Sequence, residues 1–555
     1  MAATVIDPVR ARAAEAPDWP GLVLLRDDGG REVITAAELW TDVARAAAGL
    51  RRAGIRPDDV IVVMLDLSRE LIAVFLGAMA AGAVPTIVAT ASARVDAQLY
   101  HQRIETLLRN AGAAAVIVSA ATEPHALGLP CRIIRSDTLA DADGGDVPHD
   151  LAGDRLAFIQ YTSGSGGVQK GVAHTHAGML RYIESKRVGL PLAADDVIVN
   201  WTPLYHDQGL LSGLLAPLVI GFRTVMMSPQ RWVRQPGLLL QCMHEYGGTL
   251  CYMPNFALNH CVRAMRESDV RELDLRRWRL LLLGGEPVRA DSLRAFSERF
   301  APQGFRESAL RAGYGMAEMV EGITASLAGP PRVDWISTAA LQREGHAVPV
   351  APEADGSASF VSCGPTKDGA EMRIVDGDGV PLADRCVGEI EVRAEYAMRE
   401  YYRRPDLTRA AFRPDGWFRT ADRGYLVDGE LYVVGRTSDM IIVGGKKLAP
   451  EEIEAAAERV PGVQPGRVVA FGVADRRGGT ERVVLVCESA KPDDAEQCIA
   501  VERQLRRAVT QALGVTLGEV RFVERGWIVK TSSGKRARGE NRAKYERELG
   551  EDAAP

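Results

Sequence analysis

The segment that most constrains this chain is a short apolar run followed directly by a loop of glycine and serine. Residues 156–160 read LAFIQ, which predicts a buried strand, and residues 161–171 read YTSGSGGVQKG. Glycines let a backbone approach a ligand closely, and successive exposed N–H groups form a concave site for anions. A phosphate-binding loop at the end of a strand, and hence a nucleotide site, is one interpretation; a solvated surface loop is the other. The side chains suited to phosphate are Thr162, Ser163, Ser165 and Lys170.

This loop is not a P-loop. That motif requires Gly, four residues, Gly-Lys and then Ser or Thr. Counting from Gly164, residue 169 is Gln and the residue after Lys170 is Gly171. The phosphate-binding interpretation therefore depends on the other segments of the chain.

Length and composition are those of a multidomain globular protein. The chain has 555 residues, 46% of them hydrophobic and 25% charged, with a net charge of −6. This charge predicts no general affinity for nucleic acid. Eight cysteines occur without a C-x-x-C pair, and the first residues lack an apolar core, so we expect a cytoplasmic protein with reduced thiols. The apolar stretch 209–227 is interrupted by Ser, Pro and Arg, which favours a buried helix and strand over a membrane span.

Helical and strand patterns alternate in the first half of the chain. Residues 35–53 and 71–81 predict helices. Strands are expected at 60–65, 85–89, 114–118 and 279–285. This alternation predicts a parallel sheet covered by helices.

The second half changes texture twice. Short strands at 371–375, 388–393 and 430–434, separated by Gly/Asp turns, predict an antiparallel unit. Beyond residue 440 the α/β alternation returns, which predicts a separate domain. The expected fold is α/β, with a large N-terminal domain of layered sheets and helices, a small antiparallel β subdomain, and a smaller mobile α+β C-terminal domain. The predicted boundaries are 1–435 (with an insertion-like segment at 329–360 and the β subdomain at 361–435), 436–439 as hinge, and 440–555.

Together with the loop, four segments carry a family resemblance. They read NWTPLYHDQGL (200–210), GYGMAE (313–318), WFRTADRGYL through VVGR (417–436) and KTSSGK (530–535). In order and spacing the chain resembles the adenylate-forming superfamily of acyl-CoA ligases, luciferases and peptide-synthetase adenylation domains. MSPQRWVRQP (227–236), GGEPVRADSL (284–293) and FVSCGP (360–365) look most like fatty acyl-AMP ligases. Segment 329–360 stands where those ligases carry an insertion associated with transfer to a carrier protein.

The resemblance implies ATP-dependent activation of an acid as acyl-AMP, with pyrophosphate released and Mg²⁺ as cofactor. It implies that Lys535 bridges the attacking carboxylate and the α-phosphate, and that His206 positions or gates the substrate. Glu318 and Thr162 are expected to hold the metal ion. The implied nucleotide site is Thr162, Ser163, Gly164, Ser165, Lys170, Gly284, Gly285, Glu286, Pro287, Tyr314, Gly315, Asp422 and Arg436. The expected acid pocket is His206, Asp207, Gly213, Met253, Asn255 and Met316, and the expected hinge is Ser438.

Two departures leave the acceptor open. Residues 166–169 read GGVQ where such ligases have a hydroxyl-bearing pair and then Pro-Lys, and GGKKLAPEEIE (444–454) resembles CoA ligases and adenylation domains more closely. The leading hypothesis is transfer to the phosphopantetheine thiol of an acyl carrier protein. The alternatives are an acyl-CoA ligase, or an enzyme that activates a small acid, nitrite included, for transfer to an amine; a non-catalytic nucleotide-binding relative is a further alternative. Nucleic acid and integral membrane association are not expected.

Overall fold

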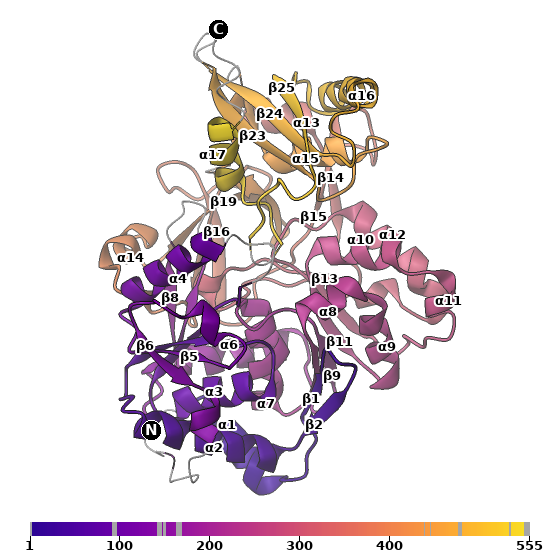
Figure 1. Ribbon diagram of the computed structural model, residues 1–555. Helices are drawn as coiled ribbons and strands as arrows, with labels where there is room; N and C mark the ends of the chain where they lie inside the picture. Colours follow the sequence, from indigo (N-terminus) through magenta and orange to yellow (C-terminus); the bar gives the residue numbers. More distant parts are fainter. Residues whose placement is uncertain are drawn as a thin grey trace.

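The computed structural model describes residues 3–91, 97–140, 147, 151–162, 169–437, 439–443, 446–475, 480–531 and 534–548. The chain forms a large body built on three sheets, an antiparallel β unit beside it, and a smaller C-terminal body (Figure 1). This α/β architecture confirms the predicted fold class. No helix in the described ranges is long and apolar enough to cross a membrane.

The central sheet of the large body has seven strands in the order β13-β12-β11-β9-β10-β1-β2. Its neighbouring pairs are parallel except β1 and β2, which form an antiparallel edge. The predicted strand at 279–285 is β12 of this sheet. The strands are β1 (Leu22–Leu25), β2 (Arg31–Ile34), β9 (Val197–Asn200), β10 (Arg223–Met227), β11 (Leu250–Met253), β12 (Leu280–Leu283) and β13 (Leu310–Ala312).

Two smaller sheets complete the body. The first is parallel, in the order β4-β3-β5-β6, and contains the other three predicted strands. The second is antiparallel, in the order β18-β8-β7, so the Gly/Ser loop connects the two strands of a hairpin. The strands are β3 (Val60–Met64), β4 (Val84–Ile87), β5 (Ala115–Val118), β6 (Arg132–Arg135), β7 (Leu156–Tyr161), β8 (Gly171–Thr175) and β18 (Glu400–Tyr401).

Helices cover both larger sheets, as the alternation predicted. The predicted helix at 35–53 begins after Thr35, whose side chain accepts a hydrogen bond from the Glu38 N–H while Glu38 bonds back to the Thr35 N–H. Gly77 lets the next helix pack closely, because a Cβ there would lie 2.7 Å from the Ala46 Cβ. The helices are α1 (Ile6–Glu15), α2 (Ala36–Arg52), α3 (Arg69–Ala80), α4 (Ala97–Ala111), α5 (Asp137–Ala140), α6 (His176–Gly189), α7 (Ala216–Ile220), α8 (Pro229–Arg234), α9 (Gly237–Glu245), α10 (Asn255–Ala264), α11 (Glu267–Val270) and α12 (Ala290–Phe300).

The apolar stretch 209–227 is buried within this body. It forms a π-helical segment, Gln208–Leu215 (η2), then α7 and β10, as expected for a buried helix and strand. The Asp207 carboxylate accepts the Gln208 N–H at 2.7 Å at the start of η2.

The β unit is antiparallel, as predicted, with strand order β16-β17-β19-β20. Its strands are β16 (Ala370–Val375), β17 (Gly388–Ala394), β19 (Phe418–Val427) and β20 (Glu430–Arg436), with α14 (Pro405–Ala411) between β18 and β19. The insertion-like segment forms its own hairpin, β14 (Val333–Ser337) with β15 (Ser357–Val361), around helix α13 (Thr338–Glu344).

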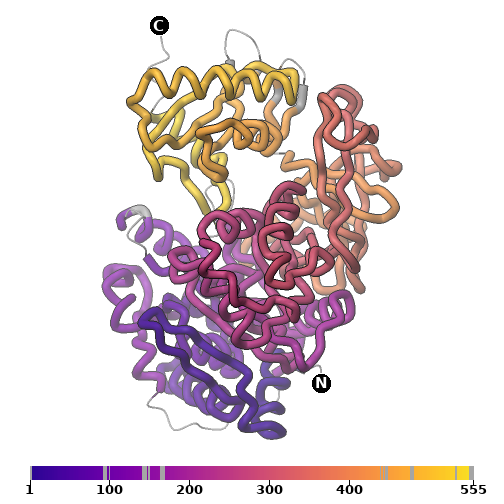
Figure 2. Tube along the Cα trace, turned by 90° about the vertical axis from the view of Figure 1, so that its right-hand side faces the viewer, coloured from indigo at the N-terminus to yellow at the C-terminus, as the bar shows by residue number. Residues whose placement is uncertain are grey.

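The C-terminal body has its own core of buried aliphatic side chains. It lies above the large body in Figure 1, coloured orange to yellow, and Figure 2 shows it next to the β14–β15 hairpin. Its elements are β21 (Ile441–Val443), β22 (Lys446–Leu448), α15 (Pro450–Glu458), β23 (Val468–Asp475), β24 (Thr480–Glu488), α16 (Ala495–Leu513), β25 (Glu519–Val523) and α17 (Arg538–Glu548). The predicted limits of the domains and hinge stay predictions.

A buried ion pair holds neighbouring parts of the central sheet together. Asp196, only 3% exposed, precedes β9 and accepts hydrogen bonds from Arg279 Nε at 2.9 Å and from the Thr249 hydroxyl at 2.6 Å. Burial alone would raise the pKa of Asp196, but these donors hold it below its ordinary value. The pair therefore stabilises the fold most at pH values where Asp196 is ionised.

We expect Asp196→Ala to lower the free energy of unfolding by about 2–3 kcal/mol, somewhat less than for a fully buried pair because Arg279 stays 35% exposed. Because the folded pKa of Asp196 is depressed, its contribution is complete above its unfolded pKa and is lost as pH falls through the folded value. Thermal unfolding should show a destabilised variant at pH 7 and a smaller difference below about pH 4. A difference that is constant between pH 7 and pH 3 would contradict this assignment.

Candidate active site

The predicted nucleotide residues come from three separate elements that meet at one edge of the large body. The turn Gly284–Pro287 follows β12, Tyr314 follows β13, and Asp422 lies on β19 of the β unit. Ser163, Gly164, Ser165 and Ser438 lie outside the described residues.

Tyr314, Asp422 and Arg436 form one hydrogen-bonded group. Asp422 and Arg436 are directly paired across β19 and β20. The Asp422 carboxylate accepts the Tyr314 hydroxyl at 2.7 Å and Arg436 Nε at 3.0 Å. Burial, reinforced by Asp422, raises the pKa of Tyr314, so this ring stays neutral. A flat neutral ring beside a fixed carboxylate can stack on a base while the carboxylate accepts hydroxyl donors.

Both ends of the Gly/Ser loop are held in place. The Thr162 N–H donates to the Lys170 carbonyl at 3.0 Å. Lys170 Nζ lies 4.8 Å from the centre of the Tyr401 ring, and the Tyr401 hydroxyl donates to Glu318 Oε1 at 2.6 Å. The structure thereby connects Thr162 and Lys170 to Glu318. Tyr401 was not predicted from the sequence, and nothing in EYYRR (400–404) distinguishes it from its neighbours.

The C-terminal body contributes Lys535 to the same edge. Lys530 and Arg536 form an isolated antiparallel β-bridge that closes a loop. Within this loop the Lys535 N–H donates to the Thr531 hydroxyl at 3.1 Å. Gly285 has φ +80°, and a Cβ at that position would lie 3.7 Å from Lys535 Nζ. Gly534 lies beside the Phe256 ring, since a Cβ at position 534 would be 3.6 Å from it. The positive φ of Gly285 favours glycine there, and the distance places Lys535 beside the turn after β12.

The charges around Lys535 are mixed in sign. Burial lowers the pKa of Lys535; Asp207, Glu286 and Asp422 oppose this decrease, and Arg436 adds to it. His206 Nδ1 lies 2.6 Å from Asp207 Oδ1. Burial favours the neutral form of Asp207, yet His206 and Lys535 outweigh it and hold the pKa of this carboxyl below its ordinary value. Glu286 accepts the Phe256 N–H at 2.6 Å, which fixes the turn after β12.

The remaining predicted pocket residues face different neighbours. Gly213 packs against Asn200, since a Cβ there would lie 2.1 Å from its amide. Met253 is fully buried in the core beside α9 and α10, and Met316 packs at the core of the β unit. Asn255, 6% exposed, accepts the Arg289 N–H at 3.0 Å and donates to Ser292. Their assignment to the acid pocket stays a prediction, as does the adenine role of Gly284, Pro287 and Gly315.

Lys535 is held by an ionic cluster in the C-terminal body. The Glu454 carboxylate on α15 is fully buried and accepts hydrogen bonds from Arg536 at 2.6 Å, Arg538 at 2.8 Å and the Ala470 N–H at 3.1 Å. Burial would raise the pKa of Glu454, but the two arginines keep it below its ordinary value. Because Arg536 follows Lys535 directly, Glu454 fixes the base of the lysine loop.

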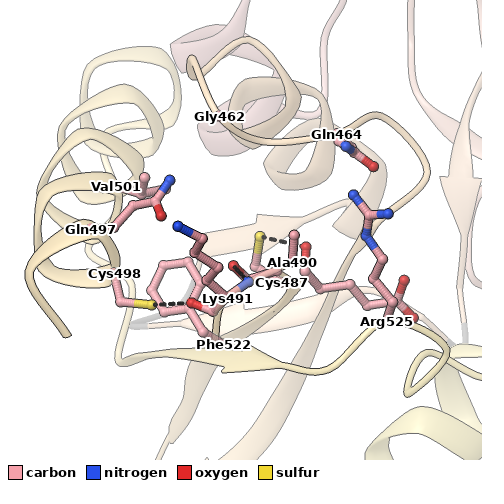
Figure 3. Close-up of a pocket in the computed structure, with 12 residues that line it drawn as sticks. Gly462, Gln464, Cys487, Ala490, Lys491, Gln497, Cys498, Val501, Phe522 and Arg525 are labelled. Carbon is pink, nitrogen blue, oxygen red and sulfur yellow. Dashed lines mark hydrogen bonds between the residues drawn. The ribbon is translucent and has the colours of Figure 1, made fainter. Parts of the chain in front are cut away.

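A separate cavity of about 220 Å³ lies within the C-terminal body (Figure 3). Its lining includes Cys487 and Cys498, with Phe522 and Arg525 from the region of β25. None of its lining residues belongs to the group around Lys535.

Comparison with known proteins agrees with this geometry. Residues 9–402 match the AMP-binding enzyme family. The chain belongs to the AMP-binding enzyme family. It is 30% identical to the long-chain-fatty-acid–AMP ligase FadD28 of Mycobacterium tuberculosis, over 94% of this chain and 92% of that one. It is 28% identical to a putative acyl-CoA synthetase of Caulobacter vibrioides, over 93% and 90%.

A solved structure from work on fatty acyl-adenylate ligases of E. coli and L. pneumophila superposes with a TM-score of 0.90. It is 26% identical, and the match covers 99% of this chain and 98% of that one. As a member of the AMP-binding family, the protein is an ATP-dependent adenylate-forming ligase.

Glu454 gives a testable positioning role. We expect Glu454→Gln to slow acid-dependent pyrophosphate release by about 10- to 100-fold, because small displacements of a charge-stabilising group cost this much. The matched control is Glu519→Gln, which removes the charge of a carboxylate bonded to Arg482, Arg521 and Tyr545 in the same body.

Both variants should lose thermal stability, and only Glu454→Gln should lose rate, while the KM for ATP changes little in either. Equal rate losses in the two variants would reduce Glu454 to a purely structural role.

Proposed function

We propose that the protein activates an acid with ATP as an acyl-AMP, releases pyrophosphate, and then transfers the acyl group to the phosphopantetheine thiol of a carrier protein with release of AMP. The observation that supports this most is the position of Lys535, brought by the C-terminal body to within reach of Asp207, Glu286 and the Tyr314–Asp422–Arg436 group. An anionic acid must attack an anionic α-phosphate, so alignment and a fixed cation are the main requirements.

Each residue of the group has a role in this proposal. Lys535 neutralises the charge shared by the attacking carboxylate and the α-phosphate. Asp422 accepts the ribose hydroxyls, and Arg436 holds Asp422 in position and contacts ribose or phosphate. The Tyr314 ring stacks on adenine, and the turn after β12 borders the base. His206, fixed by Asp207, positions the acid.

The β- and γ-phosphates belong, in this proposal, to the loop between β7 and β8. Lys170 contacts them together with the hydroxyls of Thr162, Ser163 and Ser165. Glu318 and Thr162 fit a magnesium ion, because Mg²⁺ takes one or two protein oxygens besides phosphates, and Tyr401 occupies only one Glu318 oxygen. Bound Mg²⁺ would neutralise phosphate charge at this point.

Transfer to a carrier protein is supported by the insertion-like segment. Helix α13 packs against β22 and α16 of the C-terminal body, and Gln342 Nε2 donates to the Leu513 carbonyl at 3.4 Å. This contact restrains the C-terminal body on the side of β14 and β15. Rotation at the predicted Ser438 hinge would have to break it before transfer.

The assignment of Lys535 predicts a large kinetic effect. We expect Lys535→Ala to reduce acid-dependent pyrophosphate release by about 100- to 1000-fold, the usual loss on removing one preorganised charge-stabilising donor. Lys544→Ala is the matched control, because that lysine bonds the Trp527 carbonyl elsewhere in the C-terminal body. The initial rate of pyrophosphate release at saturating ATP is measured for both variants. Activity of Lys535→Ala within a few-fold of the parent would refute the assignment.

A further inference from the structure

A cluster of buried charges lies within the large body, behind the motif that contains Tyr314. Lys186 of α6 is 1% exposed, and its Nζ lies 3.1 Å from Glu321 Oε2. The Glu321 carboxylate also accepts the Ser212 hydroxyl at 2.5 Å and the Tyr182 hydroxyl at 3.0 Å. Three donors therefore saturate one carboxylate in a place that is almost free of solvent.

This cluster adjoins the residues around Lys535. The Glu321 carbonyl packs on Gly315, where a Cβ would lie only 1.9 Å away, so Glu321 is held directly against the Tyr314 motif. Ser212 belongs to η2, the segment that begins after Asp207. Burial lowers the pKa of Lys186, and Glu321 and then Asp207 oppose the decrease, so the Asp207 carboxylate acts on both Lys186 and Lys535.

A second buried lysine extends the cluster. Lys367 is 6% exposed, and its Nζ donates to the Tyr182 hydroxyl at 3.4 Å and lies 4.5 Å from the centre of that ring. Among the described residues no carboxylate lies within ion-pair distance of it. Burial, and then the like charge of Lys186, lower the pKa of Lys367 to about 7, so this lysine depends on Glu321 for any favourable charge.

Aromatic rings close the other side of the reacting edge. Phe256, which touches the Lys535 loop at Gly534, packs edge-on against Trp201 and Trp232 at ring-centre distances of 6.1 and 6.3 Å. The two indoles stack at 3.7 Å, and Trp232 is fully buried. A substrate that extends inward from Lys535 therefore meets either stacked rings or the charged cluster.

We propose that the acid is small and polar, and that Lys186, Glu321 and Ser212 form the floor of its binding site. An alkyl tail that extended past Asp207 would lie against buried charges and displace their hydrogen-bond partners, which is unfavourable. A compact acid with few carbons, or an inorganic one, would leave these hydrogen bonds intact. This inference rests on the proposed function, and it differs from the long-chain substrate in the name of the FadD28 relative.

The first test compares acids of different length with the wild-type protein. Pyrophosphate release is measured with ATP and, separately, acetate, nitrite, malonate, hexanoate and dodecanoate. We expect kcat/KM for the preferred short acid to exceed that for dodecanoate at least 100-fold. Equal or better use of dodecanoate would overturn the inference and leave the proposed function standing. Pyrophosphate release that is the same with and without any acid would overturn both the inference and the proposed function.

The second test changes the floor. The double variant Lys186→Met/Glu321→Leu removes both charges with little change in volume and should raise the kcat/KM ratio of hexanoate to the preferred short acid at least 10-fold. The matched control is Arg373→Met/Glu391→Leu, which removes a buried ion pair in the β unit.

An unchanged ratio in the first variant, or the same change in both, would contradict a role for the floor. Ser212→Ala serves as a milder variant should the double variant fail to fold, and it should shift the ratio in the same direction; an unchanged ratio there counts equally against the proposal.

Discussion

The active-site geometry depends on one ionic cluster in the C-terminal body. Glu454 is buried with Arg536 and Arg538, and its carboxylate holds the segment that presents Lys535 to the large body. The same arginines also pair with other carboxylates, Arg536 with Glu458 and Arg538 with Glu451, so the cluster ties the lysine loop to α15 at several points. A lysine on an unanchored loop would lose rotamer and backbone entropy each time it engaged a substrate. The cluster supplies that order in advance.

Charges of opposite sign continue from this point into the large body. The Asp207 carboxylate favours the ionised forms of both Lys535 and Lys186, and Lys186 pairs with Glu321 at 3.1 Å. The carboxylates favour the ionised lysines, while burial lowers the pKa of both Lys535 and Lys186. This arrangement suits a reaction between two anions, because fixed cations offset their repulsion without any reorganisation of water.

The secondary structure and the nucleotide motifs could be predicted from the sequence, because both depend on short local patterns. The alternating helices and strands of the large body and the antiparallel strands of the β unit follow from periodicity, and the Tyr314, Asp422 and Arg436 motifs do meet. The acid pocket was harder to predict, because neighbouring residues of a strand point to opposite faces of the sheet. On β11, the Tyr252 ring lies under Lys186, whereas Met253 is buried in the core. Lys186 and Glu321 lie far apart in the sequence, and the one signal for their pairing was a glutamate within the apolar run MVEGITA (319–325).

The central claim is that an oxygen of the acid attacks the α-phosphate of ATP. It is tested by supplying the preferred acid labelled with ¹⁸O, intercepting the activated product with hydroxylamine, and measuring the mass of the nucleotide released. Attack by the acid on the α-phosphate predicts AMP that carries one heavy oxygen, together with unlabelled pyrophosphate. Unlabelled AMP, or ADP with the label in inorganic phosphate, would contradict the account.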